Sequence, residues 1–118
     1  MIERFEQLEV WQKAHALVLK VYGTTPTMLP DQKYGLTSRM QKAAVSVPAN
    51  IAEGFKRRSG PDKIHFYNMA QGSLEELRYY FILCRDLGYK IDYVLLAGQA
   101  DAVSRMLHGL VTSVERKK

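Results

Sequence analysis

The hydrophobic residues of this chain recur at alternating three- and four-residue steps, which is the spacing of one face of an α-helix. The pattern is regular between residues 67 and 84, where six apolar positions follow one another: Tyr67, Ala70, Leu74, Leu77, Phe81 and Cys84. The same spacing returns between residues 96 and 114, at Leu96, Ala100, Val103, Leu107, Leu110 and Val114. Alternating steps of this kind are typical of the seam of a left-handed helix bundle.

Applied to the whole chain, this pattern predicts four helices, over residues 8–22, 34–57, 61–87 and 93–115, and no strands. The first helix is expected to bury a face made of Val10, Trp11, Ala14, Val18, Val21 and Tyr22. The second is expected to bury a face made of Leu36, Met40, Ala43, Ala44, Val47, Ile51 and Phe55. Because the second and third connections are short, we expect an all-α fold, an antiparallel up-down four-helix bundle that forms one domain over residues 1–118.

Capping signals mark the ends of the third and fourth helices. Ser59 and Asp92 are expected to be N-caps, because a short polar side chain can accept a hydrogen bond from a free N–H of the first turn. Pro61 suits the first helical turn, where its missing N–H leaves no bond unmade. Gly88 is expected to end the third helix, since glycine readily adopts the left-handed conformation found there.

The second helix contains a proline, Pro48, in the middle of an otherwise helical pattern. Pro48 has no N–H to donate to the carbonyl group of Ala44, so we predict that the helix is kinked or restarts at Pro48. Small residues surround this position and would allow another helix to approach closely: Ala43, Ala44, Ser46, Ala49 and Ala52. We therefore interpret this stretch as a structural hinge or a packing centre of the bundle.

A second apolar stripe lies beside the seam of the third helix, formed by Phe66, Met69, Tyr80, Leu83 and Leu87. Two interpretations remain open: the helix contacts two neighbours within one bundle, or the second stripe also packs on another subunit. Glu76 lies within this stripe, and a carboxylate at an apolar position needs a partner such as Asn50 or Arg39. We predict a structural polar network of Asn50, Glu53, Ser73 and Glu76.

Composition adds little that is specific. A chain of 118 residues with 47% hydrophobic residues can bury a core without disulfides or metal. The single cysteine, Cys84, cannot form an internal disulfide and is expected to be a core thiol, with a reactive thiol as the alternative. The N-terminal residues lack an apolar signal core, and no apolar run reaches the ~20 residues that span a bilayer. A cytoplasmic location is the expectation.

The net charge of +5 is concentrated in residues 39–63. Six basic residues in this segment face only two acidic ones, and we predict that the basic residues form a nucleic-acid-binding surface: Arg39, Lys42, Lys56, Arg57, Arg58 and Lys63. Local positive charge attracts phosphate polymers, although short charged runs are also common on ordinary solvated surfaces. A smaller basic cluster at 116–118 ends the chain.

Motifs for catalysis and metal binding are missing from the sequence. A carboxylate-bridged di-metal bundle needs two Glu-x-x-His pairs, and the nearest match is Asp62-x-x-His65, which occurs once. There is no glycine-rich phosphate loop, no nucleophile motif and no Cys-x-x-Cys. We therefore expect no metal, no cofactor and no enzymatic activity. An enzymatic interpretation would rest on Glu76 and His65, without a nucleophile to accompany them.

Five segments together resemble a known family. They are Phe5-x-x-Leu8-x-Val10-Trp11-x-x-Ala14, Tyr34-Gly35-Leu36-Thr37, AAVSVPANIAEG at 43–54, Gly72-Ser73-Leu74-Glu75-Glu76-Leu77 and Leu87-Gly88-Tyr89. The chain is similar in these segments to the 23S rRNA intervening sequence proteins, small bacterial four-helix bundles. Their genes lie inside intervening sequences of the large ribosomal RNA gene, and their ribosomal label reflects that location.

The resemblance implies an up-down four-helix bundle and a ring-like homopentamer, as in the related accessory variability proteins of diversity-generating retroelements. Those more distant relatives are basic, bind nucleic acid and partner a reverse transcriptase. The partners that the resemblance implies are therefore further copies of the chain, RNA or DNA, and a protein such as a reverse transcriptase. The resemblance implies no enzymatic activity.

Two functions follow from these observations. The first is a non-enzymatic oligomeric module that binds RNA or DNA through phosphate contacts, without reading bases. A ring of subunits would strengthen such binding through effective concentration. The alternative is a protein–protein adaptor or scaffold without a nucleic-acid role, in which the apolar stripe serves assembly and the basic surface contacts an acidic protein.

Overall fold

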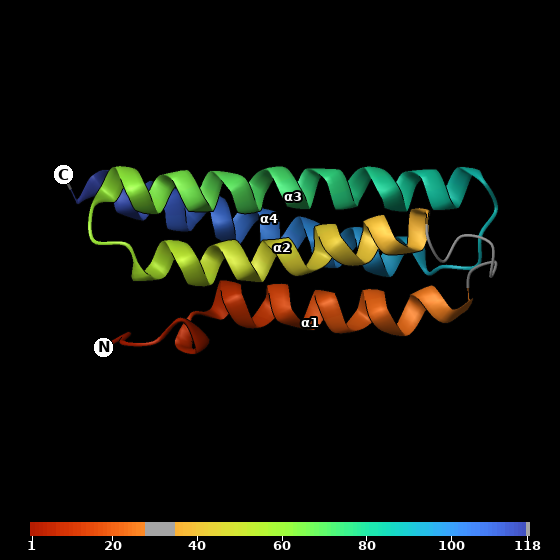
Figure 1. Cartoon of the computed structure of the whole chain (residues 1–118), viewed down its shortest axis with the longest axis horizontal. Helices are drawn as coiled ribbons and strands as arrows, with labels where there is room; N and C mark the ends of the chain where they lie inside the picture. The colour runs from red at the N-terminus through yellow and green to blue at the C-terminus, as the bar shows by residue number, and fades with distance from the viewer. Residues whose placement is uncertain (28–34, 118) are drawn as a thin grey trace.

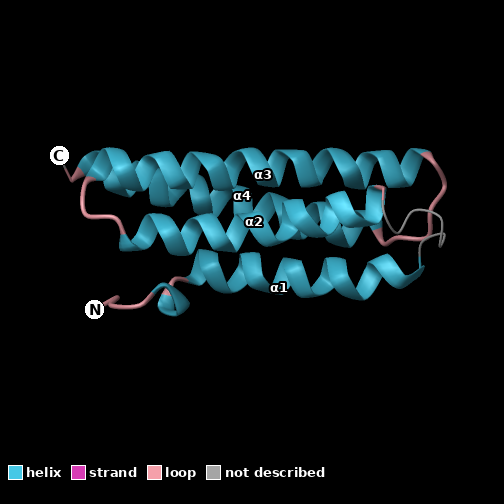
Figure 2. Ribbon diagram, in the orientation of Figure 1, coloured by secondary structure: helices cyan, strands magenta, loops and turns pink. Residues whose placement is uncertain are grey.

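The computed structural model describes residues 1–27 and 35–117 and shows an elongated bundle of four helices, 47 × 23 × 21 Å in extent (Figure 1). The helices are α1 (Glu9–Thr24), α2 (Leu36–Lys56), α3 (Gly60–Asp86) and α4 (Tyr93–Arg116). Neighbouring helices run antiparallel, and the described part of the chain contains helices and loops without strands (Figure 2). The predicted all-α four-helix bundle is confirmed, with helix boundaries that differ from the expected ones by one or two residues.

One apolar core runs along the bundle axis and receives side chains from all four helices. The buried residues are Val10, Ala14, Leu17, Val18, Val21, Leu36, Met40, Ala43, Ala44, Val47, Ile51, Tyr67, Ala70, Leu74, Leu77, Tyr80, Phe81, Cys84, Leu96, Ala100, Val103 and Leu107. The predicted seam of α3 is buried in full. The seam of α4 is buried as far as Leu107, and Leu110 and Val114 pack partly buried against it.

The buried face of α1 differs from the predicted face at its edge. Tyr22 was expected in the core, but its side chain is 46% exposed, whereas Leu17 is buried. On a wheel of 100° per residue, Tyr22 lies roughly 100° from the centre of the buried face, so it reaches the boundary with solvent. Trp11 packs partly buried against the core, stacked on His15 with ring centroids 5.1 Å apart. Phe5 meets the same indole ring edge-on.

The predicted capping residues are confirmed. The Ser59 hydroxyl accepts a hydrogen bond from the Asp62 N–H at 3.2 Å, and the Asp92 carboxylate accepts one from the Leu95 N–H at 3.1 Å. Gly88 follows α3 with a φ of +79°, the left-handed conformation expected of a C-cap glycine. These caps place the α2–α3 and α3–α4 connections at opposite ends of the bundle (Figure 1).

Helix α2 continues through Pro48, so the restart considered from the sequence does not occur. The kink at Pro48 stays a prediction. Pro48 is buried, and α2 forms its most extensive contact with α3, in agreement with the packing centre inferred from the small residues. The approach is close at Gly54, where a Cβ atom would lie 2.6 Å from Cε1 of Tyr67. The Tyr67 ring can lie against α2 there because Gly54 has no side chain.

Cys84 lies in the core, as predicted from its place in the seam. Its side chain is fully buried, and its thiol lies 3.6 Å from the sulfur of Met40. Burial raises the pKa of the Cys84 thiol to about 11, which disfavours the nucleophilic thiolate at neutral pH.

The second stripe of α3 divides between core and surface. Tyr80 is buried, Phe66 and Leu83 are half-buried, and Met69 and Leu87 are exposed. Part of the stripe therefore serves contacts within the bundle, and whether the rest meets another subunit stays open. Within the described residues, no helix combines the length and apolar character needed to cross a membrane.

Candidate functional site

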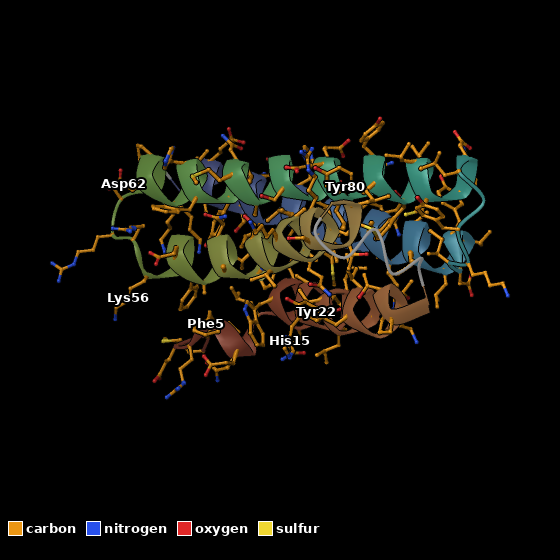
Figure 3. All side chains as sticks on the ribbon, turned by 45° about the vertical axis from the view of Figure 1, so that its right-hand side comes forward. Phe5, His15, Tyr22, Lys56, Asp62 and Tyr80 are labelled. Atoms are coloured by element: carbon orange, nitrogen blue, oxygen red, sulfur yellow. The ribbon has the colours of Figure 1, made fainter. Side chains whose placement is uncertain are left out.

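The α2–α3 turn and the end of α4 lie at the same end of the bundle (Figure 1). Basic side chains from both parts of the chain line one pocket there. We call five basic residues at this end the terminal basic cluster: Lys56, Arg57, Arg58, Lys63 and Lys117. Figure 3 shows Lys56 and Asp62 at this end, on either side of the turn. In the sequence, the C-terminal basic residues are far from the basic segment 39–63, and the two were predicted as separate clusters. The expected antiparallel topology could have predicted their proximity, because it places the end of the fourth helix beside the start of the third.

Three exposed members of this cluster, Lys56, Arg58 and Lys117, carry charge that no ion pair among the described residues compensates. Arg57 is engaged twice, since its guanidinium contacts the Glu53 carboxylate at 3.0 Å and lies 4.5 Å from the centroid of the Phe66 ring. Both partners in the Arg57–Glu53 pair are solvent-exposed, so this pair contributes at most about 1 kcal/mol to stability.

Lys63 has a structural task at the end of α2. Its ammonium group donates a hydrogen bond to the backbone carbonyl of Phe55 at 2.6 Å and lies 3.5 Å from that of Gly54. A cation in this position interacts favourably with the negative end of the helix dipole. Burial, together with the charge of Lys117, lowers the pKa of Lys63.

Arg39 and Lys42 form a second group, the α2 basic pair, nearer the start of α2. Fourteen residues separate Lys42 from Lys56, a distance of about 21 Å along a helix. The six predicted nucleic-acid-binding residues therefore lie in two groups on α2 and the following turn. Arg39 is close to the Tyr80 hydroxyl, while Lys42 is exposed without an ion-pair partner among the described residues.

The four residues of the predicted polar network do not contact one another as one group. They take part in three separate sets of contacts, one of which is the Arg57–Glu53 ion pair described above. The Asn50 amide donates to the carbonyl and the hydroxyl of Ser46, both at 2.9 Å, and the Ser46 hydroxyl lies 2.7 Å from that of Ser73. The Ser46–Ser73 bond links α2 to α3, whereas the Asn50–Ser46 bonds lie within α2. Glu76 instead accepts a hydrogen bond from Tyr80 on its own helix, at 2.5 Å.

The Glu76 contact has an electrostatic consequence for Tyr80. The hydrogen bond to Glu76 raises the pKa of Tyr80, with smaller contributions from burial, and nearby Arg39 opposes this effect. Glu53 takes no part in either contact because it pairs with Arg57. Sequence reasoning missed Ser46 and Tyr80 as the partners, although both lie one helical turn from a predicted member.

The two residues on which an enzymatic interpretation would rest, Glu76 and His65, do not lie next to each other. Glu76 and His65 are both on α3, separated by about 16 Å of helical rise, and His65 makes an edge contact with the Phe66 ring. Among residues 1–27 and 35–117, no group of three or more His, Cys, Asp or Glu side chains could hold a metal ion. The described surface carries charged and apolar groups, which can bind partners by charge attraction and by apolar contact.

Comparisons with known proteins agree with the architecture. A family model described as 23S rRNA-intervening sequence protein matches residues 6–109. A crystal structure from Bacteroides thetaiotaomicron, a protein of unknown function from the S23 ribosomal protein family, superposes with a TM-score of 0.80 and 19% identity. The superposition covers 87% of this chain and 95% of that one, and at this identity it shows the fold alone. The comparison with curated proteins gave no match.

Proposed function

The chain belongs to the 23S rRNA-intervening sequence protein family, and from this premise we propose that it is a non-enzymatic, oligomeric module that binds RNA or DNA through phosphate contacts. The observation that carries the proposal is the terminal basic cluster. Side chains that are distant in sequence, Lys56 and Arg58 on one side and Lys117 on the other, meet at one end of the bundle.

Phosphate contacts of this kind need exposed cations without competing carboxylates. Lys56 and Arg58 meet this condition, since neither is paired with a described residue. Arginine and lysine that neutralise phosphates release condensed counterions, and this release favours binding irrespective of base sequence. A few such contacts per chain give weak affinity, so the proposal needs several copies of the cluster to act together.

Exposed apolar residues support oligomerisation as part of this proposal. Val94 and Leu95 at the start of α4 are 80% and 41% exposed and line a groove against α1 together with Ala16. Large exposed side chains beside small ones suit contact with another subunit. A ring, such as the homopentamer implied by the resemblance, would present one terminal basic cluster per subunit and multiply the binding energy of each.

The test compares two double variants that lose the same charge. One carries Lys56→Ala and Arg58→Ala in the terminal basic cluster, and the control carries Lys20→Ala on α1 and Lys90→Ala in the α3–α4 connection, which lies at the other end of the bundle. Fluorescence anisotropy with labelled structured RNA, single-stranded DNA and duplex DNA would report the affinities. We expect the cluster variant to bind about tenfold more weakly to every nucleic acid, with a salt slope lower by about two units.

The control variant is expected to stay within about twofold of the unmodified protein, because it removes charge away from the phosphate-binding surface. Equal losses in the two variants would reduce the effect to net charge and contradict the assignment of the cluster. Absence of binding to all three nucleic acids near physiological salt would contradict the proposal itself. That result would favour the adaptor alternative, with an acidic protein as the partner.

A further inference from the structure

A pocket of about 590 Å³ opens at the same end of the bundle, between the N-terminal residues, the α2–α3 turn and the end of α4. This volume is within the range of small-molecule sites in proteins. Its walls are mainly apolar and come from all parts of the chain that meet there: Ile2, Leu8, Phe55, Pro61, Leu110 and Val114. A pocket with such walls favours a ligand that has a hydrocarbon body.

One polar group in the pocket has no partner. Tyr67 lines the pocket and is only 1% exposed, yet its hydroxyl makes no hydrogen bond to any residue that the structure describes. Burial raises the pKa of Tyr67 to about 12, so the phenol stays protonated and can donate. The hydroxyl itself keeps some accessible area, since Gln99 Oε1 is the only fully enclosed side-chain N or O atom without a partner among the described residues. A ligand atom in the pocket can therefore reach the hydroxyl and accept its hydrogen bond.

The charges around the pocket are all of one sign. Arg58, Lys63 and Lys117 line it, and no carboxylate does so within the described residues. Lys63 and Lys117 are close enough for the charge of one to lower the pKa of the other. This mutual repulsion has no acidic side chain in the lining to relieve it, so an anionic ligand would gain from both ammonium groups.

We propose that this pocket binds a single-chain amphipathic anion, of which a fatty carboxylate is the simplest example. The hydrocarbon would lie against the aliphatic walls near Leu110 and Val114. The carboxylate would face the ammonium groups of Lys63 and Lys117 and accept the hydrogen bond of the Tyr67 hydroxyl. A nucleobase fits less well, since only Tyr67 and Ser113 offer polar side-chain atoms for its edges, apart from the cations.

The pocket shares Arg58, Lys63 and Lys117 with the terminal basic cluster, so the probe is chosen to report on the pocket without nucleic acid. Isothermal titration calorimetry of the full chain would use decanoate below the concentration at which it forms micelles. Decanol, with the same tail and no charge, and decyltrimethylammonium, with the opposite charge, are the matched ligands. We expect decanoate to bind once per chain, at least tenfold more tightly than decanol, and decyltrimethylammonium to show no saturable binding.

Two variants locate the site. Tyr67→Phe removes only the hydroxyl and should weaken decanoate binding by about tenfold, as expected for one hydrogen bond to a charged group. Lys117→Gln removes an exposed cation beyond the end of α4 and should weaken it by about threefold. Lys42→Gln, on the distant α2 basic pair, is the matched control and should leave the affinity unchanged. Circular dichroism of each variant would establish that the helical fold is retained.

Several outcomes would overturn the inference. They are no saturable binding of decanoate, equal affinities for decanoate and decanol, or the same affinity in Tyr67→Phe and Lys42→Gln. Nucleic-acid affinity measured on Tyr67→Phe separates this inference from the proposed function, because the buried hydroxyl is not part of the phosphate-binding surface. If Tyr67→Phe loses decanoate but keeps nucleic-acid binding, the pocket is a ligand site in its own right.

Discussion

Tyr67 of α3 packs so closely against Gly54 of α2 that a Cβ atom at Gly54 would lie 2.6 Å from Cε1 and 2.8 Å from Cδ1 of the ring. The neighbouring side chain is close as well, since the same Cβ would lie 3.1 Å from Cβ of Phe66. Tyr67 is buried, with 1% of its surface exposed. This contact holds the last turn of α2 against the first turns of α3, beside the terminal basic cluster.

The first prediction concerns Gly54→Ala. Alanine has the better helix propensity, by about 1 kcal/mol, but the added methyl group must displace a buried aromatic ring at a cost of about 1–3 kcal/mol. We expect a net loss of about 1 kcal/mol in the free energy of unfolding, measured by urea denaturation.

Gly72→Ala is the matched control for that substitution. Gly72 also lies inside a helix, but a Cβ atom there would meet nothing within 4 Å. The propensity gain should then appear alone, as a stabilisation of about 0.5–1 kcal/mol. If the two glycine variants changed stability in the same direction, the close contact at Tyr67 would not be the reason for Gly54.

A second prediction concerns the hydroxyl pair of Ser46 and Ser73. Each single change to alanine leaves the other hydroxyl without its partner across the α2–α3 interface, and we expect a loss of about 1 kcal/mol. The double variant should lose less than the sum of the two. A double-mutant cycle by urea denaturation should give a coupling free energy of about 0.5–1 kcal/mol. Strict additivity would show that the hydroxyls do not interact in solution.

The buried phenol of Tyr67 predicts a loss of stability in alkali. Its pKa of about 12 in the folded protein lies above the ordinary value of 10.0. The contribution of the protonated phenol to the free energy of unfolding is therefore complete below pH 10 and is lost as the pH rises toward 12. In this interval Tyr67 releases its proton more readily in the unfolded chain than in the folded protein. Tyr67 alone should account for a loss of about 1 kcal/mol between pH 9 and pH 11.

Tyr67→Phe isolates this effect from other groups that titrate in the same interval, of which the buried Cys84 thiol is one. Urea denaturation at pH 9, 10 and 11 should show a shallower decline in the free energy of unfolding for Tyr67→Phe than for the unmodified protein. Parallel declines in the two proteins would show that the phenol is free to ionise in the folded state.

A further prediction concerns self-association through the groove lined by Val94 and Leu95. Replacing both with aspartate would place charges in an apolar contact, where desolvation is costly. We expect the particle mass, measured by light scattering after size-exclusion chromatography, to fall from a multiple of the chain mass to that of one chain. Tyr79→Asp, on an exposed position of α3, is the control and should keep the larger mass.

Much of the fold follows from local pattern. The three-four spacing identifies the buried face of each helix because burial in a bundle is decided mainly by angular position on the helix. The caps at Ser59 and Asp92 were predictable since each depends on a bond to a residue only three positions away. Prediction failed at Tyr22, where the edge of the buried face depends on how far the neighbouring helices spread.

The candidate site could be predicted from the sequence only in part. The proximity of Lys117 to Lys63 depends on the end of α4 reaching the start of α3, and a linear count of charges cannot show it. The pocket next to them is a property of packing, since Ile2 and Leu8 form walls with residues from three other parts of the chain. Glu76 was predicted to bond across helices, but Tyr80, one turn away on the same helix, satisfies it.

The salt dependence of nucleic-acid affinity tests phosphate binding most directly. Fluorescence anisotropy of the unmodified protein with labelled structured RNA should be measured across a series of salt concentrations that brackets the physiological value. We predict micromolar or tighter binding near physiological salt and a log–log slope of several units, because each neutralised phosphate releases counterions. No binding at that salt, or binding with a slope near zero, would contradict a phosphate-contacting function.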